Sequence, residues 1–269
     1  MGRHGEGWHN AAESFYGTPA WNCYWSLLNG NSTASWADAE LTTNGINQAL
    51  IANRFWTFLI TDQKIPTPQS YYTSPLERCL ATANLTFSGL PLPTNRPFVP
   101  TIKEGLREGI SLHTCDRRHN KTYIHQHWPS YPFESGFAEN DPYWTGIVGE
   151  TNAAQDVRSK SVLDDIFAHD SSTYISITSH SGEIASILRV LGRRVFSLNT
   201  GAVIPVLVKA ETRSGDESLT TPSFTASSHC TTAPVTSLSS ASNGGCVCPN
   251  SAMPVTTPLI TIGPFKRRI

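Results

Sequence analysis

Two short predicted strands, each followed at once by a predicted helix, restrict the fold of this chain most. Residues 69–74 predict a strand that ends at Pro75, a residue suited to the first turn of the helix predicted up to Leu85. Residues 173–179 are rich in β-branched side chains and predict a second strand, with a helix from Glu183 to Leu191. Strands that alternate with helices favour an α/β fold, a three-layer sandwich with a mainly parallel central sheet flanked by helices.

Further elements extend this pattern. Between Leu41 and Ile60, apolar residues recur with a period of about 3.6 residues, as in a helix with one face on a sheet. Residues 151–169 also predict a helix, and residues 202–209 predict a last strand. Residues 11–40 are rich in Trp, Asn, Ser and Gly, and they predict a long ordered loop near the mouth of a site.

The chain is predicted to consist of one domain, residues 1–210, and a tail, residues 211–269. A length of 269 residues allows one sizeable core. Residues 109–150 lack clear periodicity but contain several histidines, arginines and tryptophans, which is typical of a cap over a site. A surface excursion in contact with solvent is the alternative for this insertion. Ser, Thr and Pro dominate the tail, which is expected to be disordered because it has few large apolar residues to bury.

Charge and hydropathy argue against two kinds of partner. The net charge of -1 argues against a nucleic-acid-binding protein held by overall electrostatics. The chain has no run of about 18 apolar residues that would span a membrane, and it does not open with a signal peptide pattern. We therefore expect a cytoplasmic protein, or a secreted one if a further segment precedes residue 1. The oligomeric state is not specified by the sequence.

The six cysteines favour free thiols over a disulfide framework. Cys23, Cys79 and Cys115 are scattered, without the spacing of metal ligands. Cys246-Val247-Cys248 contains a close pair, but no second pair or nearby histidine completes a metal site. We expect neither a metal nor a cofactor.

The segment Arg3-His4-Gly5 contains residue types suited to holding a phosphoryl group. The neutral imidazole of His4 can act as a nucleophile, and the guanidinium of Arg3 is a planar donor that matches phosphate oxygens. Gly5 lets the backbone approach an anion closely, and Asn10 adds an amide donor a little over one helical turn later. Taken alone, such a short segment also occurs on solvated loops, so its context must decide.

Further candidate catalytic residues also lie directly after predicted strands or at the start of the helices that follow them. Arg78, Glu108 and His180, like Arg3 and His4, fall just after a predicted strand or at the start of the helix that follows. In a parallel sheet these positions converge in the crevice beyond the carboxyl ends of the strands. The sequence therefore predicts one site that contains all five residues.

Only Met1 and Gly2 precede Arg3, so the strand that should deliver His4 is predicted to be missing. Either an upstream segment carries this first core strand, or the fold does without it. The first interpretation is favoured, because an absent central strand would leave its neighbours with unpaired backbone groups.

Together these segments resemble the histidine phosphatase superfamily, its phosphoglycerate-mutase-like branch, and most of all the fungal phosphatase-like members. The resemblance covers roughly residues 3–209. It is carried by the order and spacing of Arg3-His4-Gly5 with Asn10, Leu41-Thr42-x-x-Gly45-x-x-Gln48-Ala49, Ser74-Pro75-Leu76-x-Arg78-x-x-x-Thr82-Ala83, Leu106-Arg107-Glu108 and Ser179-His180-Ser181-Gly182. Gly7 departs from the small hydroxyl residue that many relatives carry there.

The resemblance implies a metal-independent phosphatase that acts on a small phosphorylated metabolite in two steps. His4 would attack phosphorus to give a phosphohistidine. Arg3, Asn10, Arg78 and a protonated His180 would bind the phosphoryl oxygens. Glu108 would be the general acid for the leaving group and then the base that activates water.

Several alternatives remain open. Glu6, Glu104 and Glu150 are rivals of Glu108, with Glu104 expected to face solvent and Glu6 to shape the loop or orient Arg78. His9 is expected to be structural. The basic pair Arg117 and Arg118 is equally compatible with a grip on a second anion and with a solvated surface. For the whole chain, the alternatives are a phosphoglycerate-mutase-type phosphotransferase, a repurposed isomerase or lyase, and a non-catalytic phosphate-binding relative.

Overall fold

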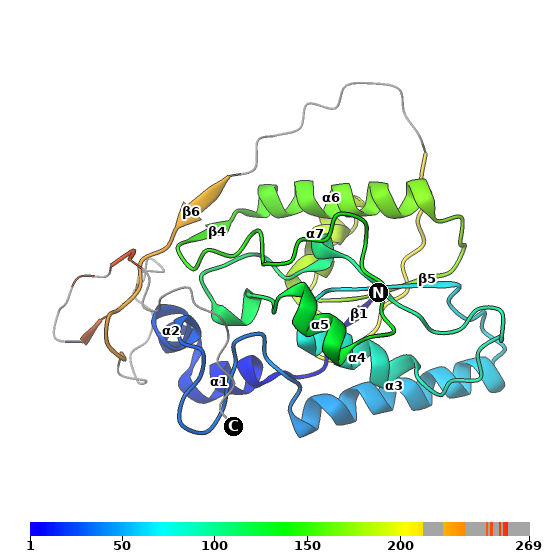
Figure 1. Ribbon diagram of the computed structural model, residues 1–269, viewed down its shortest axis with the longest axis horizontal. Coiled ribbons are helices and arrows are strands. Elements are labelled where there is room, and N and C mark those ends of the chain that lie inside the picture. The colour runs from blue at the N-terminus through cyan, green and yellow to red at the C-terminus, as the bar shows by residue number, and fades with distance from the viewer. Residues whose placement is uncertain (212–222, 235–245, 247, 250–252, 254, 258–269) are drawn as a thin grey trace.

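The computed structural model describes residues 1–211, 223–234, 246, 248–249, 253 and 255–257. Strands and helices alternate through most of this part of the chain (Figure 1). In chain order the elements are β1 (Gly2–Arg3), α1 (Trp8–Tyr16), α2 (Thr18–Cys23), η1 (Trp25–Leu27), α3 (Thr43–Thr61), β2 (Ser70–Thr73), α4 (Glu77–Phe87), β3 (Thr101–Ile102), η2 (Glu104–Leu106), η3 (Thr114–Asp116), α5 (Lys121–His127), β4 (Val148–Glu150), α6 (Asn152–His169), β5 (Ile175–Ser179), α7 (Ser181–Val190) and β6 (Phe224–Ala226).

The central sheet has the strand order β1-β5-β2-β3, and every neighbouring pair is parallel. Its register aligns the carboxyl ends of the strands, because Arg3 pairs with Ser179 while Thr73 pairs with both Thr178 and Ile102. The residues that follow these ends, among them His4, therefore emerge at one edge of the sheet, as the strand–helix pattern predicts.

Helices cover both faces of this sheet (Figure 1). On one face, Ile177 of β5 packs with Ile166 of α6 and Ile187 of α7. On the other face, Tyr71 of β2 packs with Phe87 of α4, and Trp56 and Ile60 of α3 lie against the same cluster. The α/β sandwich predicted from the sequence is thus confirmed.

The first core strand is short rather than absent. Gly2 and Arg3 form β1 and pair with β5 on one side. On the other side Gly2 forms an antiparallel bridge with Val203, and Ile204 N–H donates to the Met1 carbonyl. The strand predicted at 202–209 is reduced to this bridge, because β1 offers only two residues for pairing.

The prediction of a long loop over residues 11–40 is wrong for residues 11–23, which form most of α1 and all of α2. Gly17, with φ of 82°, separates α1 from α2 in a left-handed conformation that favours glycine. Tyr16, Trp21 and Trp36 pack into one buried aromatic cluster beneath these helices. The irregular Trp spacing conceals the helical period because each helix is short.

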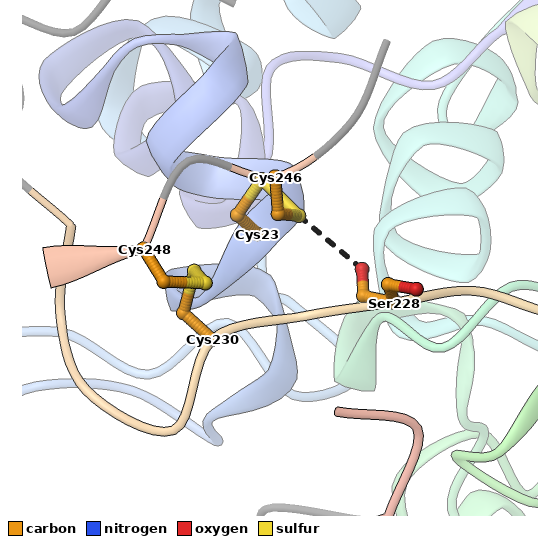
Figure 2. The surroundings of a disulfide bond; sticks show 5 residues. All are labelled: Cys23, Ser228, Cys230, Cys246 and Cys248. Atoms are coloured by element: carbon orange, nitrogen blue, oxygen red, sulfur yellow. Dashed lines mark hydrogen bonds between the residues drawn. A yellow bond between two sulfur atoms is a disulfide. The ribbon is translucent and has the colours of Figure 1, made fainter. Parts of the chain in front are cut away.

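The described part of the predicted disordered tail is bound to the domain. Residues 224–226 form β6, which pairs antiparallel with β4. The Cys23–Cys246 disulfide fastens this region to α2, and the Cys230–Cys248 disulfide links two segments within it (Figure 2). The Cys230 N–H also donates to the Cys23 carbonyl. This region has few large apolar side chains to bury, so strand pairing and disulfides hold it in place instead. The rest of the tail lies outside the described residues.

The prediction of free thiols is wrong for four cysteines and agrees with the structure for Cys79 and Cys115, which are buried and unpaired. Partners as distant in the chain as Cys23 and Cys246, 223 residues apart, are not revealed by local spacing. Within the described residues, no helix has the length and apolar character needed to cross a membrane.

Removing the Cys23–Cys246 disulfide should destabilise the protein substantially. Replacing both residues with Ser is expected to lower the free energy of unfolding by about 2–5 kcal/mol, because a cross-link restricts the unfolded chain. Denaturant unfolding of the wild type and the double variant measures the difference. With reductant present the difference should vanish, since both proteins then lack the link. Equal midpoints without reductant would show that the disulfide contributes no stability.

Candidate active site

A cavity of about 430 Å³ opens at the edge of the sheet where the strands end. Five of the residues singled out in the sequence line it, namely Arg3, His4, Asn10, Arg78 and Glu108. His180 is fully buried beside it, with its ring centroid 5.0 Å from that of His4. The structure therefore brings together all six predicted site residues.

The His4 ring is held in one tautomer. Its Nδ1 lies 2.7 Å from the Gly5 carbonyl oxygen, which can only accept a hydrogen bond, so Nδ1 carries the proton and Nε2 keeps its lone pair. Burial, followed by the charge of Arg78, holds the pKa of His4 well below its usual value. The imidazole is therefore neutral near pH 7, which is the form that a nucleophile requires.

A close approach of two backbone segments fixes the loop that carries His4. Gly5 and Gly45 face each other so closely that a Cβ on either would overlap the backbone of the other segment. The Gly5 N–H donates to Thr82 Oγ1 at 2.9 Å, and the Thr42 N–H donates to the Glu6 carbonyl at 2.9 Å. Only glycine at both positions allows α3 to support the loop at this distance.

Two guanidinium groups supply the positive charge of the cavity. Arg78 is 1% exposed, donates to the Cys115 carbonyl at 2.6 Å and lies 3.7 Å from an Asp116 carboxylate oxygen. Within the described part of the chain, its Nε has no hydrogen-bond partner, and the same is true of Arg3 Nε. Arg3 donates through a terminal nitrogen to the Leu198 carbonyl. Both groups thus keep donor capacity for a bound anion.

His180 caps α7 and hydrogen bonds through Nε2 with Ser74 Oγ at 2.8 Å. Burial, then the charge of Arg78, lowers its pKa well below the usual value. In the free protein His180 is therefore neutral, which differs from the protonated form that the resemblance implies for the phosphoryl-bound site. Full desolvation, which the sequence does not reveal, is the reason.

The Glu108 carboxylate is held at the start of α7. It accepts the N–H groups of Gly109, Gly182 and Glu183 at 2.9, 3.2 and 3.1 Å. Burial, then the nearby charge of Asp116, raises its pKa, although these hydrogen bonds oppose the change. A raised pKa suits a carboxyl group that must carry a proton to a leaving group.

The rival carboxylates have other partners. Glu104, expected to face solvent, is instead buried between Arg107 and Arg118. Glu6, offered as an orienter of Arg78, accepts hydrogen bonds from the hydroxyl of Thr42 and the amide of Asn44.

Glu150 reaches the cavity wall but pairs with Arg158, and it accepts the Ile110 N–H. Of the basic pair, Arg118 is bound to Glu104 and is not a surface residue.

One cluster on the cavity wall was given no individual role from the sequence. His113, Cys115 and Asp116 lie together on the wall, with potential metal-ligating atoms within 4.8 Å of one another. Burial, then Asp116, raises the pKa of the Cys115 thiol well above its usual value, and the Asp116 carboxylate already forms an ion pair with Arg78 at 3.7 Å. A protonated thiol and a paired carboxylate fit a divalent cation poorly. The insertion that carries them has no periodic pattern, so no sequence signal connected them to Arg78.

Comparison with known proteins gives concordant results. A family model described as "Histidine phosphatase superfamily (branch 1)" matches residues 24–198. A relative from Arthroderma benhamiae named "Probable phosphoglycerate mutase" is 53% identical over 212 residues, covering 79% of this chain and 63% of that protein. "Phosphomutase-like protein 3" from Candida albicans is 42% identical over 216 residues, with 80% and 66% covered. The chain thus spans about two thirds of the length of these two relatives.

Solved structures show more distant similarity. A phosphoserine phosphatase from Entamoeba histolytica has 19% identity and a TM-score of 0.42, with 74% of this chain and 85% of that chain covered. A phosphoglycerate mutase from Thermus thermophilus has 20% identity and a TM-score of 0.38, with 74% and 86% covered. Neither likeness bears on the reaction of this chain.

Proposed function

This chain belongs to the histidine phosphatase superfamily, and we propose that it hydrolyses a small phosphomonoester through a phosphohistidine on His4. The observation that carries the proposal is the state of the His4 ring. It is neutral, its Nδ1 is engaged with Gly5, and its other nitrogen is free to attack in a cavity lined by two guanidinium groups and a carboxyl of raised pKa.

In the first step, His4 Nε2 bonds to phosphorus while the bond to the ester oxygen breaks and Glu108 gives that oxygen a proton. In the second, Glu108 takes a proton from water, the water oxygen bonds to phosphorus, and the bond to Nε2 breaks. Arg3 and Arg78 bind the equatorial oxygens in both steps. The Asn10 side-chain amide adds a donor, since its oxygen is used by the Gly7 N–H. The residues supply every proton and charge in this scheme without a metal.

His180 would complete the phosphate site after substrate binds. A phosphate dianion favours the charged form of a nearby imidazole, so binding is expected to raise the pKa of His180 from its low value in the free protein. The ring can donate to a phosphoryl oxygen in either protonation state, because a neutral imidazole still has one N–H.

A phosphotransferase of the mutase type is the second candidate, because two curated relatives are named as probable phosphoglycerate mutases. We favour hydrolysis, since retention of the phosphoenzyme requires water to be excluded. Steady-state assays of phosphate release and of 3- to 2-phosphoglycerate conversion, with and without 2,3-bisphosphoglycerate, separate the two. Hydrolysis without primer is expected; conversion that depends on primer, with little phosphate released, would establish the mutase.

The two disulfides also favour one of the two locations considered from the sequence. Stable disulfides form in oxidising compartments and are rare in the cytosol. We therefore propose that the protein acts in an oxidising compartment or outside the cell, and not in the cytoplasm.

A further inference from the structure

The outer part of the catalytic cavity differs in charge from the phosphate end. Among the described residues that line the cavity, Arg3 and Arg78 are the only lysine or arginine side chains, and both act on the nucleophile His4. The proposed mechanism uses both for the transferred phosphoryl group. No further lysine or arginine of the described chain lines the wall to meet a second anionic group of a substrate.

Histidines do not compensate for this lack of positive charge. Burial lowers the pKa of His113 to about 4, and it lowers that of His9 well below the usual value. Both line the cavity and are neutral near pH 7. Their rings offer hydrogen bonds, but no charge for a carboxylate or a second phosphate.

Negative charge, by contrast, reaches the outer part from Glu13 of α1. Glu13 lines the cavity, and within the described chain it forms no ion pair; its carboxylate accepts a hydrogen bond from the Thr18 hydroxyl. Burial lowers the pKa of both Arg3 and His113, and the Glu13 carboxylate opposes that lowering in each. Its field therefore extends across the space in front of His4, where a substrate's alcohol part must lie.

Uncharged hydrogen-bonding groups complete the rim. Asn22 of α2 and Asn152 of α6 are exposed at the cavity, and within the described residues neither side-chain amide has a hydrogen-bond partner. The Ser111 hydroxyl is also on the wall, where it donates to Asp116, accepts the His113 N–H and keeps one further acceptor lone pair. Amides and hydroxyls that donate and accept match the hydroxyl groups of a polyol or sugar.

From this distribution we propose that the enzyme selects phosphomonoesters of uncharged, hydroxylated alcohols and discriminates against substrates with a second anionic group, with Glu13 as a specificity-determining residue. The inference rests on the proposed phosphatase function and deepens it. Phosphoglycerates and bisphosphates are then poor substrates, because a second negative charge would lie near Glu13 without a cation.

Two matched substrate pairs test this inference. Glycerol 3-phosphate and 3-phosphoglycerate differ by a hydroxymethyl group against a carboxylate. Glucose 6-phosphate and 6-phosphogluconate differ by a hemiacetal carbon against a carboxylate. In each pair the member without the carboxylate should have at least about a tenfold higher kcat/KM. The repulsion between an unpaired carboxylate of the substrate and Glu13 is on the order of the energy that shifts a pKa by one unit, which corresponds to a factor of about ten.

A variant that removes the charge of Glu13 provides the second test. Glu13→Gln should shift the ratio of kcat/KM within each pair about threefold to tenfold toward the anionic member, mostly through KM, and less at high salt. Asp164→Asn is the matched control, because it removes one negative charge from the exposed surface of α6, outside the cavity lining. This control should leave the ratio as it is in the wild type.

The outcomes separate the inference from the function on which it rests. A wild-type preference for the anionic members, or a ratio that Glu13→Gln and Asp164→Asn change equally, overturns the specificity proposal while hydrolysis stands. If folded protein hydrolyses no member of either pair and forms no phosphohistidine, the proposed function fails and this inference fails with it.

Discussion

Replacing His4 with Asn is expected to lower kcat for phosphomonoester hydrolysis by about 10⁴-fold or more, the scale at which loss of a nucleophile acts. Asn keeps a polar side chain of similar reach but cannot form a phosphoryl intermediate. The residue is buried and its Nδ1 contact with Gly5 is short-range, so the fold should survive. Initial rates at saturating substrate, with circular dichroism of the variant, measure the effect.

His9→Asn is the matched control for this prediction. His9 lines the same cavity, and its ring centroid is 5.3 Å from that of His4. Its loss should reduce turnover far less and should leave phosphorylation of the chain intact. If His4→Asn retained wild-type turnover, or if His9→Asn lost the phosphoenzyme instead, the assignment of the nucleophile would be wrong.

Replacing Glu108 with Gln is expected to lower kcat for an alkyl phosphate by about 10²–10⁴-fold, the usual contribution of a general acid or base. Gln preserves the hydrogen bond from the Gly182 N–H through its carbonyl oxygen but cannot supply or accept the proton. With a nitrophenyl phosphate, whose leaving group needs no proton, the first step should remain fast and the second slow. Rapid mixing should then show a burst of nitrophenolate close to one equivalent of enzyme.

The pH dependence of the wild type follows from the same residue. Burial raises the pKa of Glu108, so its proton is retained at higher pH than in a free glutamate and is lost as pH rises through the raised value. The kcat/KM for an alkyl phosphate should therefore fall on the alkaline side. This alkaline limb should be absent in Glu108→Gln and present in the control Glu40→Gln, an exposed carboxylate outside the cavity lining. An unchanged limb in Glu108→Gln would assign the acid to another group.

The topology of the site could be predicted because it follows from a general property of parallel sheets. Each strand delivers the residues that follow it to the same edge, so His4, Arg78 and His180 converge once the strand–helix pattern is seen. Their ionisation could not be predicted in the same way. The low pKa of His180 depends on complete burial and on Arg78, which are properties of packing and not of local sequence.

The insertion and the tail were less predictable for a different reason. Asp116, which pairs with Arg78, and Glu104, which is buried between two arginines, lie in or beside irregular segments where no period indicates which side faces inward. Disulfide partners such as Cys23 and Cys246 meet only in the folded chain. Apart from the local Glu104–Arg107 pair, these contacts join residues remote in sequence, which composition and periodicity do not encode.

The most direct test of the account is a rapid-quench experiment on the folded protein with a phosphomonoester carrying labelled phosphate. We expect label on the chain within the first turnover, labile in acid and stable in alkali, located on His4 and absent from His4→Asn. Phosphate release at a competent rate without any such label, or label on another residue, would contradict the proposed mechanism.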